Sequence, residues 1–295
     1  MTDQVAITRR DVEVSGGTLA CFRLGGASDS PVAVAVHGIT SNSRAWIAVA
    51  RALGERVALL APDIRGRARS NELPGPYGVA THVEDLVAVL DAFGLEQTAL
   101  VGHSLGAYIV ARFGVTHPDR VRALVLVDGG LPIPGTENVE MHAFLDEFLG
   151  PALARLKMRF PDPEAYREWW RAHPAIAGSD VSDDDLAAYA DHDLIGSAPE
   201  MRSSVLEASV RGDAGEVGPG ALAAQQLTLP ARMLCAPRGL LNDPNPMQPI
   251  ALAEAWAAAD SGRRAAVLVP DVNHYTITLG STGAHAVADA IAEVV

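Results

Sequence analysis

The chain lacks the features that mark secreted, membrane-spanning or nucleic-acid-binding proteins. Its two cysteines, Cys21 and Cys235, both lie in apolar runs, which argues against a disulfide framework. The first residues contain no apolar signal core, and no apolar run reaches transmembrane length. The formal net charge of −13 disfavours nucleic acid or an anionic membrane surface as a partner. These absences predict a cytoplasmic protein that binds neither nucleic acid nor membrane.

Signatures of metal and cofactor binding are also missing. No cluster of His, Cys, Asp and Glu has the spacing of metal ligands, and no glycine-rich phosphate loop occurs. We therefore expect no metal and no cofactor. The composition, with 48% hydrophobic and 20% charged residues over 295 positions, is typical of a globular protein large enough for one domain with an insertion.

Short aliphatic runs alternate with helical patterns along the first 130 residues. Residues 43–53 and 83–90 carry apolar side chains at helical spacing. The predicted strands cover residues 32–36, 57–61, 98–102 and 122–127. This alternation predicts an α/β fold with a doubly wound, mostly parallel sheet and helices on both faces. In such sheets, ligands bind beyond the carboxyl ends of the strands.

The pattern changes between residues 131 and 226, where prolines, acidic clusters and helical stretches replace the strands. Strand patterns return at 231–236 and 264–269. We therefore predict a core of residues 1–130 and 227–295, with a helical lid inserted at residues 131–226. Its large aromatic side chains are expected mainly to pack the lid onto the sheet; they are Phe144, Phe148, Phe160, Trp169, Trp170 and Tyr189.

A candidate nucleophile lies between a predicted strand and a predicted helix. Residues 102–106 spell Gly-His-Ser-Leu-Gly, and a serine in such a turn is held in a strained conformation that exposes its hydroxyl. A serine hydroxyl needs a base within reach, and histidine is suited to that task near neutral pH. His274 follows the last predicted strand, so its loop should emerge at the sheet edge that carries Ser104. We predict that Ser104 is the nucleophile and that His274 is the base that accepts its proton.

The acid that would support His274 has two candidates. Asp243 follows the predicted strand at 231–236, after a long loop, and Asp128 ends the strand that follows Ser104. Either carboxylate could hold the imidazole in the required tautomer and stabilise its charged form. The sequence leaves both open, with Asp128 slightly favoured.

Several motifs together resemble the α/β-hydrolase superfamily over nearly the whole chain. They are His37-Gly38, the segment Asp63-Ile-Arg-Gly-Arg-Ala-Arg-Ser70, Gly102–Gly106 and Asn273-His274. The segment that begins at Asp63 is similar to the family's D-x-R-G-x-G-x-S, a structural motif, with Ala68 in place of its second glycine. The resemblance implies an oxyanion hole formed by the backbone N–H groups of Ile39 and Leu105. His37 and His103 are interpreted as structural.

These observations predict a serine hydrolase that cleaves a small-molecule carboxylic ester or lactone through an acyl-enzyme intermediate. A C–C bond hydrolase or a thioesterase on the same triad is the alternative within enzymes. A non-catalytic ligand receptor with the same fold is the alternative from another class. Serine at position 104 argues against epoxide hydrolase or dehalogenase chemistry, because the resemblance implies an aspartate nucleophile for those relatives.

Overall fold

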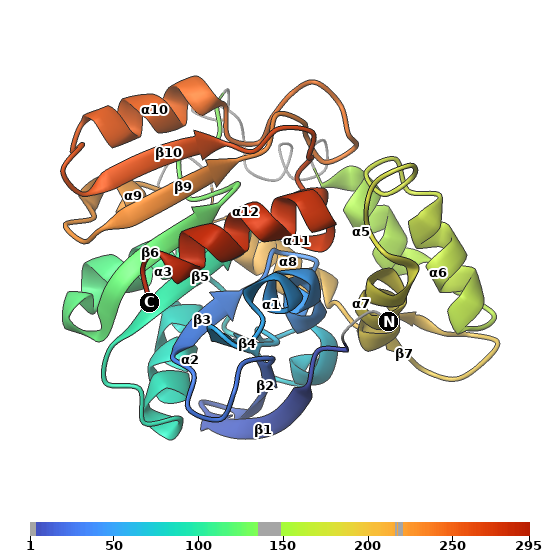
Figure 1. The fold of residues 1–295 in the computed structure, drawn as a ribbon. Coiled ribbons are helices and arrows are strands. Elements are labelled where there is room, and N and C mark those ends of the chain that lie inside the picture. The colour runs from blue at the N-terminus through green and yellow to red at the C-terminus, as the bar shows by residue number, and fades with distance from the viewer. Residues whose placement is uncertain (1–3, 135–148, 216, 218–220) are drawn as a thin grey trace.

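A computed structural model describes residues 4–134, 149–215, 217 and 221–295, which form an eight-stranded sheet flanked by helices (Figure 1). The strand order is β1-β2-β4-β3-β5-β6-β9-β10. The first two pairings are antiparallel and all others are parallel. The strands are β1 (Ile7–Val14), β2 (Gly17–Leu24), β3 (Val32–Val36), β4 (Ala58–Pro62), β5 (Thr98–His103), β6 (Val121–Val127), β9 (Ala231–Cys235) and β10 (Arg264–Leu268). The predicted α/β fold is confirmed.

Each face of the sheet is covered by its own apolar layer. In β3, Ala33 and Ala35 face one layer, whereas Val34 and Val36 face the other. A parallel strand buried on both faces is apolar throughout, which explains its unbroken run of Val and Ala. The helices of one layer are α1 (Ile47–Leu53), α11 (Thr276–Leu279) and α12 (Ser281–Ala292); those of the other include α2 (Val79–Ala92), α3 (Leu105–Thr116) and α10 (Ile250–Ala258).

Between β6 and β9 the described chain is mostly helical. Its elements are α5 (Gly150–Lys157), α6 (Pro163–Arg171), α7 (Asp183–Asp193), β7 (Leu194–Ile195), β8 (Arg202–Ser203), α8 (Glu207–Ala214) and α9 (Ala223–Gln226). Figure 1 shows α5, α6 and α7 together beside one end of the sheet. The expectation of no strand here was wrong, because β7 and β8 pair in a hairpin. Two-residue strands are too short to produce an alternating pattern.

Most of the aromatic side chains predicted to pack the insertion do so. Phe160, Trp170 and Tyr189 are buried in a cluster that also contains Ala45 and Leu279 of the core, whereas Trp169 is half-buried. Phe144 and Phe148 lie outside the described residues. Three short 3-10 helices complete the fold: η1 (Ser43–Trp46), η2 (Ala68–Ser70) and η3 (Pro118–Arg120).

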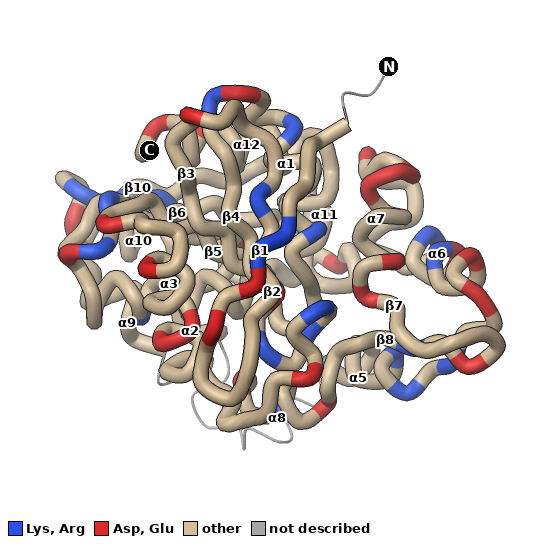
Figure 2. The backbone as a smooth tube through the Cα atoms, turned by 90° about the horizontal axis from the view of Figure 1, so that it is seen from below, with Lys and Arg blue, Asp and Glu red and all other residues tan. Residues whose placement is uncertain are grey.

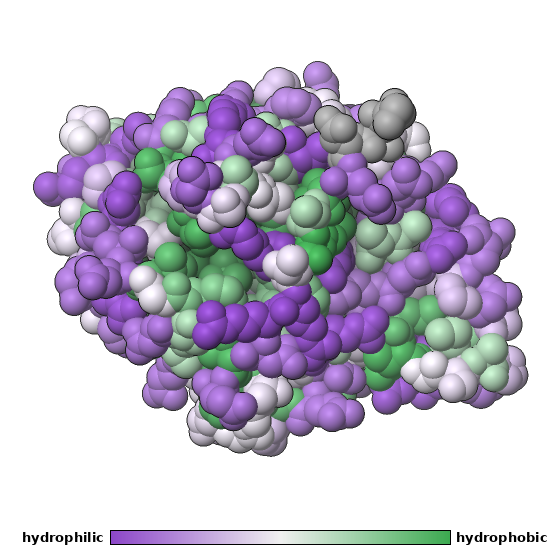
Figure 3. All heavy atoms as spheres, turned by 60° about the horizontal axis from the view of Figure 1, so that its bottom comes forward, coloured by the Kyte–Doolittle hydropathy of each residue, from purple (hydrophilic) through white to green (hydrophobic). Residues whose placement is uncertain are grey.

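The surface combines polar side chains of both charges with restricted apolar areas. Lys or Arg alternates with Asp or Glu along α6, whereas α7 contains several Asp residues and no Lys or Arg (Figure 2). The face in Figure 3 shows apolar surface gathered in a hollow bordered by polar side chains. Among the described residues, no helix has the length and apolarity needed to span a bilayer.

Candidate active site

Ser104 lies at the turn that joins β5 to α3. Its backbone has φ 53° and ψ −120°, a strained region for a residue with a side chain. The Ser104 N–H donates to the Val127 carbonyl on the neighbouring strand at 3.0 Å, which anchors the turn. The predicted strand–serine–helix geometry is therefore present.

Close backbone packing around this turn requires glycine. A Cβ at Gly102 would overlap the Gly106 carbonyl, and one at Gly106 would overlap the Val36 carbonyl. A Cβ at Gly129 would lie 2.6 Å from the Ser104 carbonyl oxygen. The glycines therefore allow strand, helix and the Asp128 loop to approach the serine.

His274 lies in the loop after β10 and is paired with Asp128. Its Nδ1 donates to the Asp128 Oδ2 at 2.7 Å, and both side chains are buried. The other Asp128 oxygen accepts from the Ala236 N–H at 3.0 Å, and the His274 N–H donates to the Arg238 carbonyl at 3.1 Å. The Asp128 carboxylate and the His274 backbone are thus each fixed by a backbone group, and the carboxylate orients the imidazole, with Nε2 left for proton transfer.

Asp243 has a different environment. Its carboxylate accepts from the backbone N–H groups of Leu241 and Asn245 at 3.4 and 3.0 Å. Burial opposes ionisation, but these hydrogen bonds outweigh it and lower the pKa of the carboxyl. Within the described part of the chain, no hydrogen bond or ion pair joins Asp243 to His274. Of the two candidate acids, the structure brings only Asp128 to the histidine, because Asp243 organises its own turn.

The two predicted oxyanion donors flank Ser104. Leu105 is the first residue of α3, so its N–H has no acceptor within the helix. The Gly38 carbonyl accepts from His37 Nδ1 at 2.8 Å and from the Ser41 N–H at 3.1 Å. The Gly38 carbonyl and the Ile39 N–H belong to the same trans peptide and point in opposite directions. These two hydrogen bonds therefore also fix the direction of the Ile39 N–H, away from the groups that bind the carbonyl. Neither donor has a protein acceptor among the described residues.

His37 and His103 contact backbone groups, in agreement with their structural interpretation. His37 Nε2 accepts from the Ile64 N–H at 3.1 Å, and burial lowers the pKa of this histidine to about 4. His103 Nε2 donates to the His274 carbonyl at 2.8 Å, and burial lowers its pKa well below the usual value. Both rings are therefore neutral and hold the loops that carry Ile39 and His274.

A small cavity of about 50 Å³ opens at Ser104. It adjoins an outer cavity of about 330 Å³, with which it shares Ala152, Leu240, Met247 and Tyr275. The inner lining is Gly38, Ile39, Thr40, Ser41, Ala45, His103, Ser104, Leu149, Ala152, Tyr189, Leu240, Met247, His274, Tyr275, Thr278 and Leu279. Sequence reasoning missed Tyr275, although its place directly after His274 was a usable signal.

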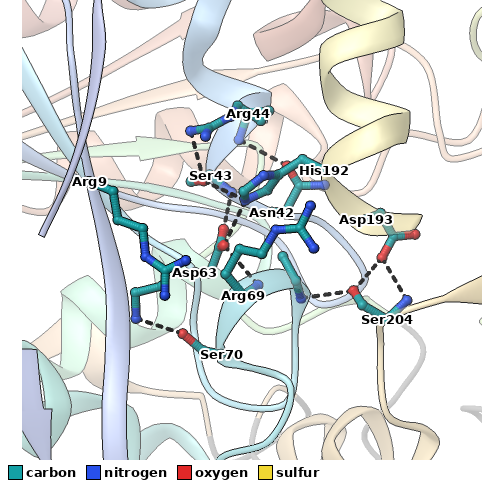
Figure 4. A network of polar contacts seen from close by, with 12 residues as sticks. Arg9, Asn42, Ser43, Arg44, Asp63, Arg69, Ser70, His192, Asp193 and Ser204 are labelled. Atoms are coloured by element: carbon teal, nitrogen blue, oxygen red, sulfur yellow. Dashed lines mark hydrogen bonds and ion pairs between the residues drawn. The ribbon is translucent and has the colours of Figure 1, made fainter. Parts of the chain in front are cut away.

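The buried carboxylates of Asp63 and Asp85 bind donors of the protein itself. Asp63 accepts from the Ser43 N–H at 2.8 Å and pairs with His192 of α7 at 2.7 Å (Figure 4). Arg65, assigned to the structural motif, forms two hydrogen bonds with Asp85 at 2.7 and 2.8 Å. Across the described ranges, no three or more His, Cys, Asp or Glu side chains are grouped as a metal site.

The Asp63 environment predicts a pH-dependent stability. Burial opposes its ionisation, but His192 and the Ser43 amide outweigh burial and lower its pKa from 3.8 to about 2. A depressed pKa stabilises the fold above the unfolded value, and this contribution is lost as pH falls from about 4 to about 2. Its size is about 2 kcal/mol.

Denaturant unfolding over this pH range would measure the effect. Asp63→Asn is expected to be less stable than the wild type near neutral pH and to lose less stability between pH of about 4 and about 2. Asp91→Asn, at an exposed ion pair with Arg120, should keep the wild-type slope. Equal slopes for all three proteins would contradict the assignment.

Comparison with known proteins identifies the fold. The sequence profile of the alpha/beta hydrolase fold matches residues 31–165. The crystal structure of E-2-(acetamidomethylene)succinate hydrolase superposes with a TM-score of 0.78 at 21% identity, covering 98% of this chain and 99% of that one. The chain has the α/β-hydrolase fold. This α/β-hydrolase fold is also found in a thioesterase domain from the curacin biosynthetic pathway, with a TM-score of 0.73, 22% identity, and coverage of 97% of this chain and 99% of that one.

Curated relatives of this α/β-hydrolase match over shorter segments. Lipase LipV of Mycobacterium tuberculosis is 30% identical over 161 residues, which are 54% of this chain and 59% of that protein. A putative carbamate hydrolase RutD of Klebsiella pneumoniae is 36% identical over 105 residues, 35% of this chain and 40% of that protein. The chain thus matches less than two thirds of the length of these relatives.

Proposed function

We propose that this α/β-hydrolase is a serine hydrolase that cleaves a carboxylic ester, lactones included, through an acyl-enzyme intermediate. The observation that carries the proposal is the 2.7 Å hydrogen bond from His274 Nδ1 to Asp128, in the loop beside the strained Ser104. Unpartnered backbone donors next to the serine add support. Related proteins named as a lipase and a carbamate hydrolase fit the same class of reaction.

In the acylation step, Ser104 Oγ attacks the ester carbonyl while His274 Nε2 accepts the serine proton. Asp128 holds the imidazole in the tautomer with its proton on Nδ1 and stabilises the imidazolium that forms. The oxyanion accepts hydrogen bonds from the N–H groups of Ile39 and Leu105, each contributing about 3–4 kcal/mol of transition-state stabilisation. The imidazolium then protonates the leaving alcohol, and the carbonyl re-forms as an acyl-enzyme.

Deacylation repeats these steps with water. His274 removes a proton from the water molecule, which attacks the acyl carbonyl, and the same two amides stabilise the second oxyanion. Collapse of this intermediate returns the proton to Ser104 Oγ and releases the carboxylic acid. No residue needs to change its position between the two halves of the reaction.

The cavity lining favours a largely apolar substrate. Leu149, Leu240, Met247 and Leu279 contribute aliphatic side chains beside Ser104, with no Lys or Arg among the described lining residues. Such a lining suits a neutral ester, and the polar groups close to the serine orient its carbonyl. Aryl esters, lactones and acyl thioesters assayed side by side would show which bond the protein cleaves fastest. The acyl thioesters in this panel test the thioesterase alternative.

Labelling with a fluorophosphonate probe tests the proposed function. The folded protein is expected to react at Ser104, which mass spectrometry of the digested protein would locate, because only an activated serine displaces the fluoride rapidly. Heat-denatured protein is the control and should stay unlabelled. A folded protein that does not react, yet binds ester ligands, would instead indicate the receptor function.

A further inference from the structure

The segment that carries Ile39 contacts two buried arginines. Arg67 Nε donates to the Ile39 carbonyl at 2.9 Å, and Arg155 Nη2 donates to the Thr40 carbonyl at 3.0 Å. Arg67 belongs to the core, whereas Arg155 lies on α5 of the insertion. Their side chains are 0% and 2% exposed, so both hydrogen bonds are shielded from water.

We propose that Arg155 is a positioning residue of the oxyanion hole, so that the helical insertion orients the Ile39 N–H as well as covering the serine. This inference rests on the proposed function. It assigns the insertion a part in transition-state stabilisation that a simple cover over the pocket would not have.

The counter-ion of Arg155 is itself firmly held. Arg155 Nη1 donates to Asp193 Oδ2 at 2.7 Å. Asp193 Oδ1 accepts from the Ser203 and Ser204 hydroxyls at 3.0 and 2.7 Å, and Tyr166 donates to Oδ2. Figure 4 shows Asp193 and Ser204 at the base of α7. A carboxylate with this many donors fixes the guanidinium that it binds.

The second arginine is anchored in the same way. Arg67 pairs with Asp213 of α8 at 2.5 Å, and Asp213 also accepts from the Gly78 N–H at 2.7 Å. The two successive carbonyls, of Ile39 and Thr40, are therefore each bound by a buried arginine whose carboxylate partner lies between β6 and β9. Packing of the insertion and the conformation of this segment are coupled.

Fixing these carbonyls restricts the oxyanion donor. The peptide planes that follow Ile39 and Thr40 are held by the arginines, and the plane that contains the Ile39 N–H is held through the Gly38 carbonyl. Donors fixed before the reaction stabilise the oxyanion without reorganisation. Release of the Thr40 carbonyl would let the segment rotate, and misplacement by about 1 Å can cost about 100-fold in rate.

Arg155→Lys tests the proposal. Lysine keeps the charge but lacks the planar fork that joins Asp193 to the Thr40 carbonyl. We expect kcat for ester hydrolysis to fall about 10- to 100-fold, while KM changes less than about threefold. The affinity of a boronic acid or trifluoromethyl ketone, which forms a tetrahedral adduct with Ser104, should fall by the same factor as kcat/KM.

Arg51→Lys is the matched control. Arg51 of α1 forms two hydrogen bonds with Asp185 of α7 at 2.6 and 2.7 Å, so this ion pair also links core and insertion. These two bonds join α1 to α7 and do not involve the Ile39 segment. The control should lose some thermal stability and keep the wild-type adduct affinity. Equal effects of Arg51→Lys and Arg155→Lys on kcat and adduct affinity would overturn the proposal.

A milder variant covers the case in which Arg155→Lys fails to fold. Tyr166→Phe removes one donor to Asp193 and one acceptor of Arg155 Nη1, and it keeps the Arg155 side chain itself; we expect kcat and adduct affinity to fall about 2- to 10-fold together. Unchanged adduct affinity would count against the proposal. A wild-type protein that forms no adduct and hydrolyses no ester would overturn the proposed function as well, whereas an active wild type with unaffected variants overturns only the positioning role.

Discussion

Ser104→Ala is expected to lower kcat for ester hydrolysis by roughly 10⁵- to 10⁶-fold, because the acyl-enzyme can no longer form. The backbone amides of Ile39 and Leu105 would remain, so a small rate above that of water should survive. Steady-state kinetics on an aryl ester would measure the loss.

The folding stability of Ser104→Ala provides the control for this experiment. Alanine at a position with φ 53° keeps the backbone strain of the wild type, so the melting temperature should change little. A variant that retains more than about a hundredth of the wild-type kcat would exclude Ser104 as the nucleophile, since the oxyanion hole alone does not sustain such a rate.

The second large effect distinguishes the two candidate acids. Asp128→Asn is expected to lower kcat about 10⁴-fold, because an amide at this position favours the wrong tautomer of His274. Substrate binding should be affected far less, so KM should stay within a few-fold of the wild type.

Asp243→Asn is the matched substitution. Its carboxylate accepts hydrogen bonds from the backbone amides of its own turn, and kcat should change less than about twofold. A severe loss in Asp243→Asn together with an active Asp128→Asn would show that the base takes its acid from the other loop. Two active variants would refute the triad.

Features that depend on neighbours in sequence were predictable. The Val32–Val36 strand, the helix after Ser104 and the glycines of the turn all leave local patterns, since burial on both faces and steric crowding act within a few residues. The order of Ser104 and His274 along the chain also placed both at one sheet edge. The two-residue strands β7 and β8 left no such pattern and were missed.

The identity of the histidine's partner could not be obtained this way. Asp128 and Asp243 both follow predicted strands, and only their positions in the folded chain decide which carboxylate reaches His274. It arises because Asp128 is held by the Ala236 amide on the adjacent strand end, whereas Asp243 accepts from the amides of its own turn. Local propensity contains no information about that choice.

The sequence by itself determined the α/β class, the strained serine turn and the histidine that lines the same cavity, because each depends on short-range periodicity or chain order. Only the tertiary structure decided that Asp128 meets His274 and that Arg155 holds the Thr40 carbonyl. These contacts join residues more than a hundred positions apart. They depend on how buried charges find partners after the sheet and the insertion have packed, and that is a property of the whole fold.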